Sequence, residues 1–119
     1  MTETQFTGKF VRALREHLGL AFIVWKHADG YSAGIPDISI SCSRDTMWIE
    51  AKLMSNPKIF EPLQLAILKK LEGHYVIWDA KIKRGCRFRA EDVVSREQVQ
   101  DRCRYAFNKL VENILDEVR

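Results

Sequence analysis

Two short strand-like segments constrain the fold of this chain more than any other feature. Residues 34–41 read GIPDISIS and residues 48–53 read WIEAKL, so β-branched or aromatic residues alternate with polar ones in both. Successive side chains of a strand point to opposite faces. Glu50 and Lys52 should therefore share one face, with opposite charges side by side.

A hairpin between the two segments would add a second carboxylate. The sequence SRDT at residues 43–46 is polar and short enough for a tight connection, which would bring Asp37 beside Glu50. Charged residues rarely lie on strands beneath helices unless they are paired or bind a ligand. Two carboxylates on fixed strands suit Mg²⁺ or Mn²⁺, and Lys52 can orient or deprotonate a water that attacks phosphorus.

The order and spacing of these residues resemble a known signature. Pro-Asp at 36–37 followed by Glu-Ala-Lys at 50–52 is similar to the motif of the PD-(D/E)xK nuclease superfamily. The opening MTETQF, Gly34 and Gln64 resemble the virus-type replication-repair nuclease branch, called VRR-NUC. The resemblance covers residues 3–78.

The resemblance implies roles for the motif residues. Asp37 and Glu50, with the carbonyl of Ala51, would hold Mg²⁺ or Mn²⁺, and Lys52 would activate or position water. These residues imply a metal-dependent deoxyribonuclease that hydrolyses phosphodiester bonds.

Two helical residues are further candidates. In the resembled family a glutamate of the N-terminal helix approaches the metal, and Glu3 matches it; the alternative is that Glu3 only favours the positive end of the helix. A glutamine in the helix after the motif reaches the catalytic face in that family, and Gln64 matches it. The alternative for Gln64 is an exposed surface position.

The resemblance and the local patterns together imply an α/β fold with a restriction-endonuclease-like core. We expect a four-stranded mixed sheet flanked by helices, in the order αβββαβ, over residues 1–78. A capping box at Thr2 and Gln5 opens the first helix, and the apolar run 20–25 predicts a central strand buried on both faces. Residues 63–72 predict a helix, and residues 75–78 predict a strand.

The buried stripe of the second helix can be predicted from its spacing. The stripe comprises Leu63, Ala66, Ile67 and Leu71.

Residues 79–119 extend this core within one domain. The densest basic run lies at residues 79–89 and predicts a ribbon that contacts the DNA backbone, or else a solvated hairpin. Residues 95–118 predict one long helix that covers the sheet or pairs with a second copy. The basic residues are Lys81, Lys83, Arg84, Arg87 and Arg89, and the helical stripe comprises Val99, Cys103, Phe107, Leu110, Ile114, Leu115 and Val118.

A polar loop at residues 26–34 leads into the motif. Loops beside a rigid site often carry binding groups. Lys26 or His27 is a candidate contact for a scissile or neighbouring phosphate, with a solvated loop as the alternative for both.

Composition narrows the class of protein. The 119 residues are enough for one modest core, and the 46% hydrophobic and 29% charged content is typical of a soluble globular domain. Three cysteines without a C-x-x-C pair argue against a zinc site or a disulfide framework, and no apolar run is long enough to span a bilayer. We therefore expect a cytosolic protein, in the host-cell cytoplasm if it is viral.

These observations lead to one principal hypothesis. We expect a structure-selective DNA endonuclease, resembling virus-type Holliday-junction resolvases, that acts as a homodimer in replication, repair or recombination. The alternatives are a monomeric flap-processing, end-processing or restriction-like nuclease, and a non-catalytic DNA-binding subunit with a nuclease fold.

Overall fold

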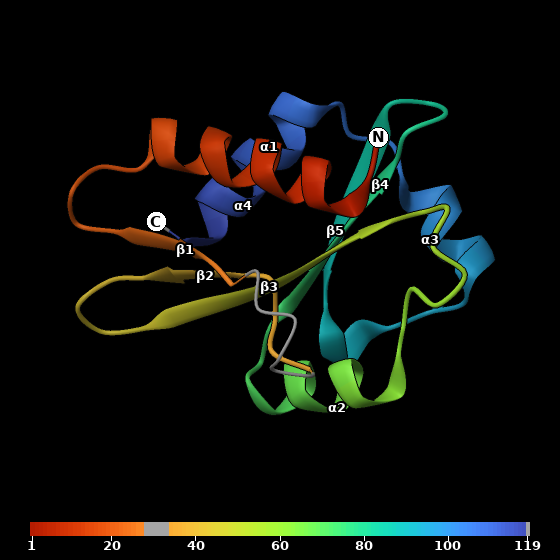
Figure 1. The fold of residues 1–119 in the computed structure, drawn as a ribbon, viewed down its shortest axis with the longest axis horizontal. Helices are drawn as coiled ribbons and strands as arrows, with labels where there is room; N and C mark the ends of the chain where they lie inside the picture. The colour runs from red at the N-terminus through yellow and green to blue at the C-terminus, as the bar shows by residue number, and fades with distance from the viewer. Residues whose placement is uncertain (28–33, 119) are drawn as a thin grey trace.

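The structure is a computed structural model that describes residues 1–27 and 34–118. Most of the loop predicted at residues 26–34 lies outside the described residues. The elements follow the predicted order, with additions after residue 78 (Figure 1). They are α1 (Glu3–His17), β1 (Ile23–Lys26), β2 (Ile38–Ser41), β3 (Thr46–Leu53), α2 (Pro62–Lys70), β4 (His74–Asp79), β5 (Arg84–Arg89), a short 3-10 helix η1 (Ala90–Asp92), α3 (Arg96–Arg102) and α4 (Phe107–Val118).

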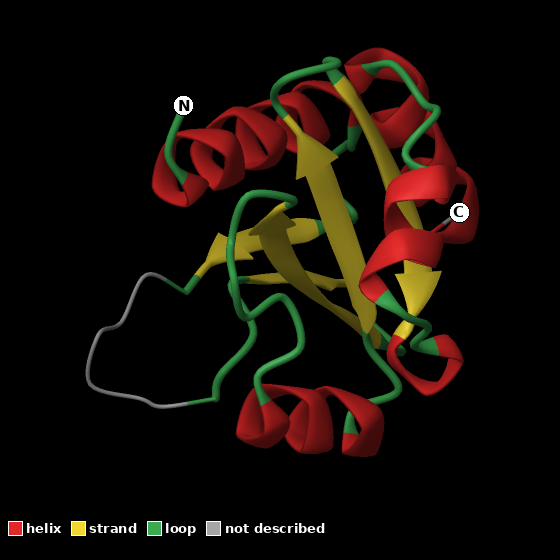
Figure 2. Cartoon of the chain, turned by 90° about the vertical axis from the view of Figure 1, so that its right-hand side faces the viewer, coloured by secondary structure: helices red, strands yellow, loops and turns green. Residues whose placement is uncertain are grey.

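The described strands form one sheet of five in the order β1-β2-β3-β4-β5. Only the β3–β4 pair is parallel; the other three pairs are antiparallel, so the sheet is mixed. The four-strand core was correctly predicted, and β5 is the added C-terminal strand. Figures 1 and 2 show α1 and α2 on opposite sides of this sheet.

The prediction of a central strand at residues 20–25 is wrong. β1 lies at the edge of the sheet, and its side chains Ile23 and Trp25 are 54% and 57% exposed. Two consecutive antiparallel connections, from β1 to β2 and from β2 to β3, leave β1 outermost. The central position belongs to β3, which carries Glu50 and Lys52.

Each face of the sheet has its own hydrophobic core. One core joins the sheet to α1 and α4 through residues such as Phe6, Ile49 and Leu110. The other joins the β3–β5 part to α2 and α3 through residues such as Leu68 and Tyr75. The capping box of Thr2 and Gln5 is present at the start of α1, as predicted.

The predicted buried stripe of the second helix is wrong. Leu68 is the fully buried residue of α2, and Leu65 packs partly against the same core. Leu63 and Leu71 are 50% and 37% exposed. The Glu61 cap and Pro62 fix where the helix begins, and packing of Leu68 against the sheet then fixes its rotation.

The tail forms two helices instead of the predicted single one. Tyr105, between α3 and α4, makes a two-bond β-bridge with Gly85, with N–O distances of 2.8 and 3.0 Å. Val99 and Cys103 belong to one core and Leu110 to the other, so the two halves of the stripe cover opposite faces of the sheet. A continuous helix cannot reach both faces, and the chain breaks between them.

This arrangement also removes the basis of the predicted dimer surface. Val99, Leu110 and Ile114 are each 0% exposed within the single chain, because they cover its own sheet.

Among the described residues, no helix is long and apolar enough to cross a membrane.

Candidate active site

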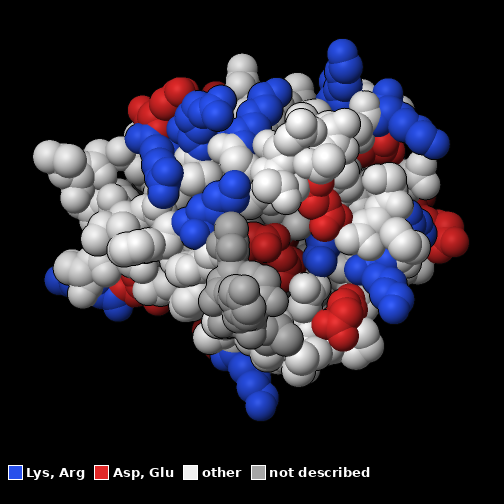
Figure 3. Space-filling view, viewed as in Figure 1, with Lys and Arg blue, Asp and Glu red and all other residues white. Residues whose placement is uncertain are grey.

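Nearly all the predicted catalytic residues line one cleft of about 250 Å³. The cleft lies where the first turns of α1 meet the ends of β1 and α2 and the middle of β3. Figure 3 shows acidic and basic side chains meeting in a hollow of this face. The lining residues are Glu3, Thr4, Thr7, Lys26, His27, Asp37, Glu50, Lys52 and Gln64. The fold brings these residues together, while their chemical roles stay predictions.

Asp37 is held in place by the neighbouring strand. Its Oδ2 accepts a hydrogen bond from the Ala51 backbone N–H at 3.1 Å, and its carbonyl accepts one from the His27 N–H at 2.7 Å. Gly34 turns the chain into this position with φ of 87°, and a Cβ there would lie 2.4 Å from Ile67 Cδ1. Only glycine fits this approach to the motif without strain.

Glu50 and Lys52 lie on the same face of β3, as predicted, and are only 2% and 7% exposed. Burial raises the pKa of the Glu50 carboxyl to about 9, helped by a hydrogen bond to Asp37 and by its negative charge. The Lys52 ammonium opposes this rise in pKa. Without a cation, the two carboxylates are therefore crowded enough to hold a proton.

Glu3 is anchored to the end of β3. Its Oε2 accepts hydrogen bonds from the Leu53 N–H at 3.0 Å and from Asn56 Nδ2 at 2.7 Å. Glu3 thus connects the start of α1 to the end of β3 while its side chain lines the cleft. Asn56 was not predicted from the sequence, because its contact spans 53 positions.

Lys26 and His27 reach the cleft from the end of β1. The His27 ring lies 2.7 Å from Ser39 Oγ through Nε2, and its centroid lies 5.5 Å from that of Trp48. The Lys26 ammonium lies close to Gly8 of α1. Both side chains therefore sit beside the carboxylates, where a phosphate contact is geometrically feasible.

Gln64 is oriented by the first turn of α2. The Glu61 carboxylate accepts hydrogen bonds from the backbone N–H groups of Leu63 and Gln64, and these bonds lower its pKa. Gln64 Oε1 is buried and has no hydrogen-bond partner among the described residues. Gln64 lines the cleft, where Lys52, a water or a ligand would supply the donor that this buried oxygen lacks.

Two cleft residues, Thr4 and Thr7, and one neighbour of Glu50, Tyr75, escaped sequence analysis. Thr7 lies one turn after Glu3 on the same helix face, a spacing that could have revealed it, and Thr4 borders the same opening. Tyr75 is paired with Glu50 in the parallel β3–β4 register, and its hydroxyl is also buried without a partner among the described residues. Burial and the nearby Glu50 charge raise the pKa of Tyr75.

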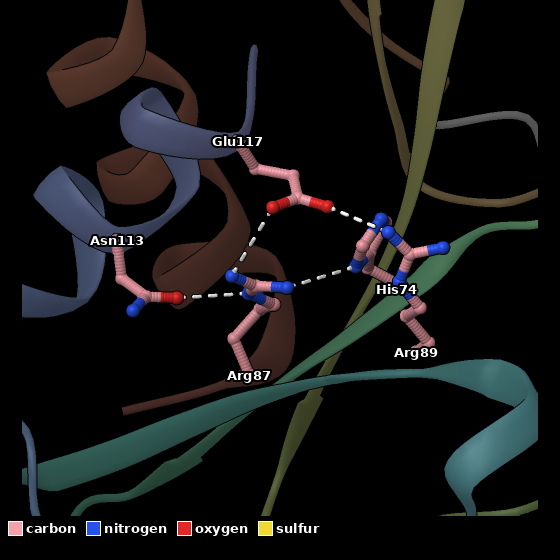
Figure 4. A network of polar contacts seen from close by, with 5 residues as sticks. All are labelled: His74, Arg87, Arg89, Asn113 and Glu117. Carbon is pink, nitrogen blue, oxygen red and sulfur yellow. Dashed lines mark hydrogen bonds and ion pairs between the residues drawn. The ribbon is translucent and has the colours of Figure 1, made fainter. Parts of the chain in front are cut away.

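The predicted basic ribbon divides into two parts. Lys81, Lys83 and Arg84 are exposed at the turn between β4 and β5. Arg87 and Arg89 instead point toward α4 (Figure 4).

The contacts of these two arginines are internal. Arg87 Nε donates to Asn113 Oδ1 at 2.8 Å, and Arg89 lies 3.0 Å from a Glu117 oxygen. Arg87 also lies 3.4 Å from His74 Nδ1 and 3.8 Å from Glu117. These contacts join β5 to α4, so contact between either arginine and DNA would compete with them.

The donor set of the cleft fits a hard divalent cation. Within residues 1–27 and 34–118, no group of three or more His, Cys, Asp or Glu side chains forms a ready-made metal site. Mg²⁺ commonly uses only one or two protein carboxylates and keeps several waters. Asp37 and buried Glu50 would hold the cation, whose positive charge would offset the crowding of the two carboxylates.

Comparisons with known proteins identify the fold. No protein-family model and no curated protein matches the sequence. Among solved structures, the chain is similar to Hjc, a Holliday junction resolvase from the archaeal hyperthermophile Archaeoglobus fulgidus. The match has a TM-score of 0.55 and 19% identity, and it covers 73% of this chain and 75% of Hjc. The chain therefore has the restriction-endonuclease-like α/β fold that its sequence predicted, shared here with a resolvase.

Proposed function

We propose that this protein is a metal-dependent DNA endonuclease that hydrolyses phosphodiester bonds in branched DNA. The observation that carries the proposal is the meeting of Asp37, Glu50 and Lys52 in one cleft of a fold shared with a Holliday junction resolvase. The motif resemblance supports a place in the PD-(D/E)xK superfamily, and the opening residues and Gln64 support the VRR-NUC branch. A viral source and a role in replication, repair or recombination belong to the same proposal.

The proposed chemistry divides among a few groups. Asp37, Glu50 and the Ala51 carbonyl would hold Mg²⁺ or Mn²⁺, with Glu3 bordering the site. The bound cation would supply positive charge that stabilises the phosphate as negative charge develops on it. Lys52, buried beside Glu50, positions or deprotonates the attacking water, and the Gln64 amide orients the lysine, the water or the phosphate.

DNA contacts are proposed within the cleft and at the turn between β4 and β5. Lys26 and His27 lie within the cleft and would contact the phosphates nearest the cut bond. The exposed turn of Lys81, Lys83 and Arg84 would hold a more distant stretch of backbone. Arg87 and Arg89 would join this surface only by leaving Asn113 and Glu117.

Symmetric cutting of a four-way junction requires two active sites. We therefore keep a cytosolic homodimer as part of the proposal, on a surface other than the tail stripe. A monomer would instead fit flap or end processing.

A substrate panel tests the proposal. Labelled four-way junctions, flaps, linear duplexes and single strands are incubated with the protein in Mg²⁺, Mn²⁺ or EDTA, and the products are separated on denaturing gels. We expect metal-dependent cutting that favours branched DNA. Binding to branched DNA without cutting in either metal would favour a non-catalytic subunit.

A further inference from the structure

The described residues cover one face of the sheet over only part of its width. The core beneath α2 and α3 includes residues of β3, β4 and β5, but among the described residues it includes none from β1 or β2. Alternation along β1 places Ile23 and Trp25 opposite Val24, which is buried against the other core. Trp25 therefore stands outside the part of this face that α2 and α3 cover, with 57% of its surface exposed.

Trp25 is the outer member of a row that crosses three strands. It pairs with Ser39 of β2, and Ser39 pairs with Trp48 of β3. Ser39 is only 3% exposed and is bonded to the His27 ring, which in turn lies against Trp48. Trp48 is partly buried against the core beneath α2 and α3, so it anchors the row to the sheet.

The outer edge of β1 is protected against pairing with another strand. The Arg15 guanidinium donates two hydrogen bonds to the Val24 carbonyl, at 3.2 and 2.8 Å. His27 N–H bonds to the Asp37 carbonyl, so alternation directs the Val24 carbonyl away from β2 and toward this edge. Occupying that carbonyl disfavours strand addition, while the aromatic face beside it stays open.

The row is continuous with the catalytic cleft. His27 lines the cleft and its ring lies against Trp48, which stands two positions before Glu50 on the same strand face. Lys26 points the other way, toward Gly8 of α1. A DNA strand entering the cleft along this face would meet the His27 ring and the Lys52 ammonium near its phosphate and an indole ring for its base. Aromatic rings stack on bases of any sequence, provided that the base is not already paired and stacked in a duplex.

We propose that Trp25 stacks on an unpaired base of the DNA substrate, next to the bond cut in the cleft. This inference rests on the proposed nuclease function and refines its substrate class. It predicts a preference for DNA whose bases are unpaired near the cut, at a branch point or in a single-stranded flap, over continuous duplex.

Binding measurements with the full-length protein test this inference. Fluorescence anisotropy in EDTA, where metal-dependent cutting is blocked, measures the affinity for a labelled 20-nucleotide single strand, a four-way junction and a linear duplex. Trp25→Ala should weaken binding to the single strand about 5- to 150-fold, the range expected for loss of one stacked base, and should leave duplex binding unchanged. Trp25→Phe keeps an aromatic face and should restore most of the affinity.

Ile23→Ala is the matched control. Ile23 is similarly exposed on the same face of β1 but has no ring, so its loss should leave single-strand binding unchanged. Thermal melts of each variant establish that it is folded. A 2-aminopurine base in the single strand should change fluorescence on binding to the wild type and to Trp25→Phe, but not to Trp25→Ala.

Three results would overturn the inference. The first is unchanged single-strand binding by Trp25→Ala, and the second is that this variant loses duplex binding to the same extent. The third is that Trp25→Ala converts a wild-type dimer to a monomer in light scattering, which would assign this face to a second copy of the chain. The proposed function is tested separately. If the wild type cuts DNA while Trp25→Ala binds normally, only the stacking inference fails; if stacking is observed but no substrate is cut, only the nuclease proposal fails.

Discussion

Two polar clusters lie on opposite faces of the same sheet, one buried and one partly exposed, and they differ in how their charges are matched. In the cleft, Glu50 is pressed against Asp37, and its pKa rises to about 9. In the second cluster, Arg87 is matched by Asn113 and Glu117, beside His74 (Figure 4). The first arrangement disfavours the ionised form of Glu50, as at many functional sites, whereas the second fixes α4 to β5.

The largest expected effect separates activity from stability in the cleft. Glu50→Gln replaces one proposed metal-binding oxygen by an amide of similar shape. We expect cleavage to fall about 100-fold or more, because a single electrostatic group in such a site is worth about 3 kcal/mol. DNA binding in EDTA should persist, and the metal-free variant should melt no lower than the wild type at pH 8. A variant that cuts normally, or one that fails to fold, would contradict this assignment.

The second cluster should respond in the opposite way. Arg87→Ala should lower the free energy of unfolding by about 1–3 kcal/mol, because partly buried partners on α4 lose their donor. Arg89→Ala is the matched control. Its side chain is 50% exposed, so loss of its ion pair with Glu117 should change stability by less than about 1 kcal/mol. Denaturant unfolding measures both, and equal losses would mean that Arg87 has no special structural role.

The two clusters should also give opposite dependences on pH in metal-free protein. The pKa of Glu50 is raised from 4.5 to about 9, so its contribution to stability is present below pH 4.5 and is lost as pH rises toward 9. Burial, then the charge of Arg87, lowers the pKa of His74 from 6.5 to about 4. The contribution of His74 is therefore present above pH 6.5 and is lost as pH falls toward 4.

Thermal melts across this pH range test both directions. Glu50→Gln should flatten the alkaline decline, and His74→Gln should flatten the acidic one. If both variants keep the wild-type pH profile, these groups do not control it.

The smallest expected effect concerns the salt dependence of DNA binding. Lys26→Ala, in the cleft, should reduce the slope of log affinity against log salt by about 0.9, the value of one duplex phosphate contact. Arg89→Ala should leave this slope unchanged, because Arg89 of the wild-type protein is already paired with Glu117. Anisotropy titrations over a range of salt concentrations make this comparison. A reduced slope for Arg89→Ala and an unchanged slope for Lys26→Ala would indicate that DNA binds on the β5–α4 side and not in the cleft.

Local signals in the sequence predicted much of the fold and the cleft. The capping box, the polar hairpin and the alternation in β3 each depend on neighbouring residues, and all three are present in the structure. The signals failed where distant segments decide burial. The apolar run at residues 20–25 leads into the edge strand β1, and α2 buries Leu68 instead of Leu63. The tail forms two helices because its apolar stripe covers both faces of the sheet.

The same limit applies to the site. Asp37 and Glu50 were predicted to be neighbours because a short hairpin joins their strands. Tyr75 reaches Glu50 only through the parallel register of β3 and β4, and Asn56 reaches Glu3 only after α1 packs on the sheet. The sequence carries no local sign of either contact.

The most direct test of the central claim is the cleavage of a labelled four-way junction in Mg²⁺ by wild-type protein and by Asp37→Asn. Asp37 is held by the Ala51 N–H and contacts Glu50, so an amide in its place should preserve the fold and remove one proposed metal-binding oxygen. We expect wild-type protein to cut near the branch point, and Asp37→Asn to bind the same junction with at least about 100-fold slower cutting. Equal cutting by the two proteins, or no cutting by wild-type protein that binds the junction, would contradict the claim that this cleft hydrolyses DNA.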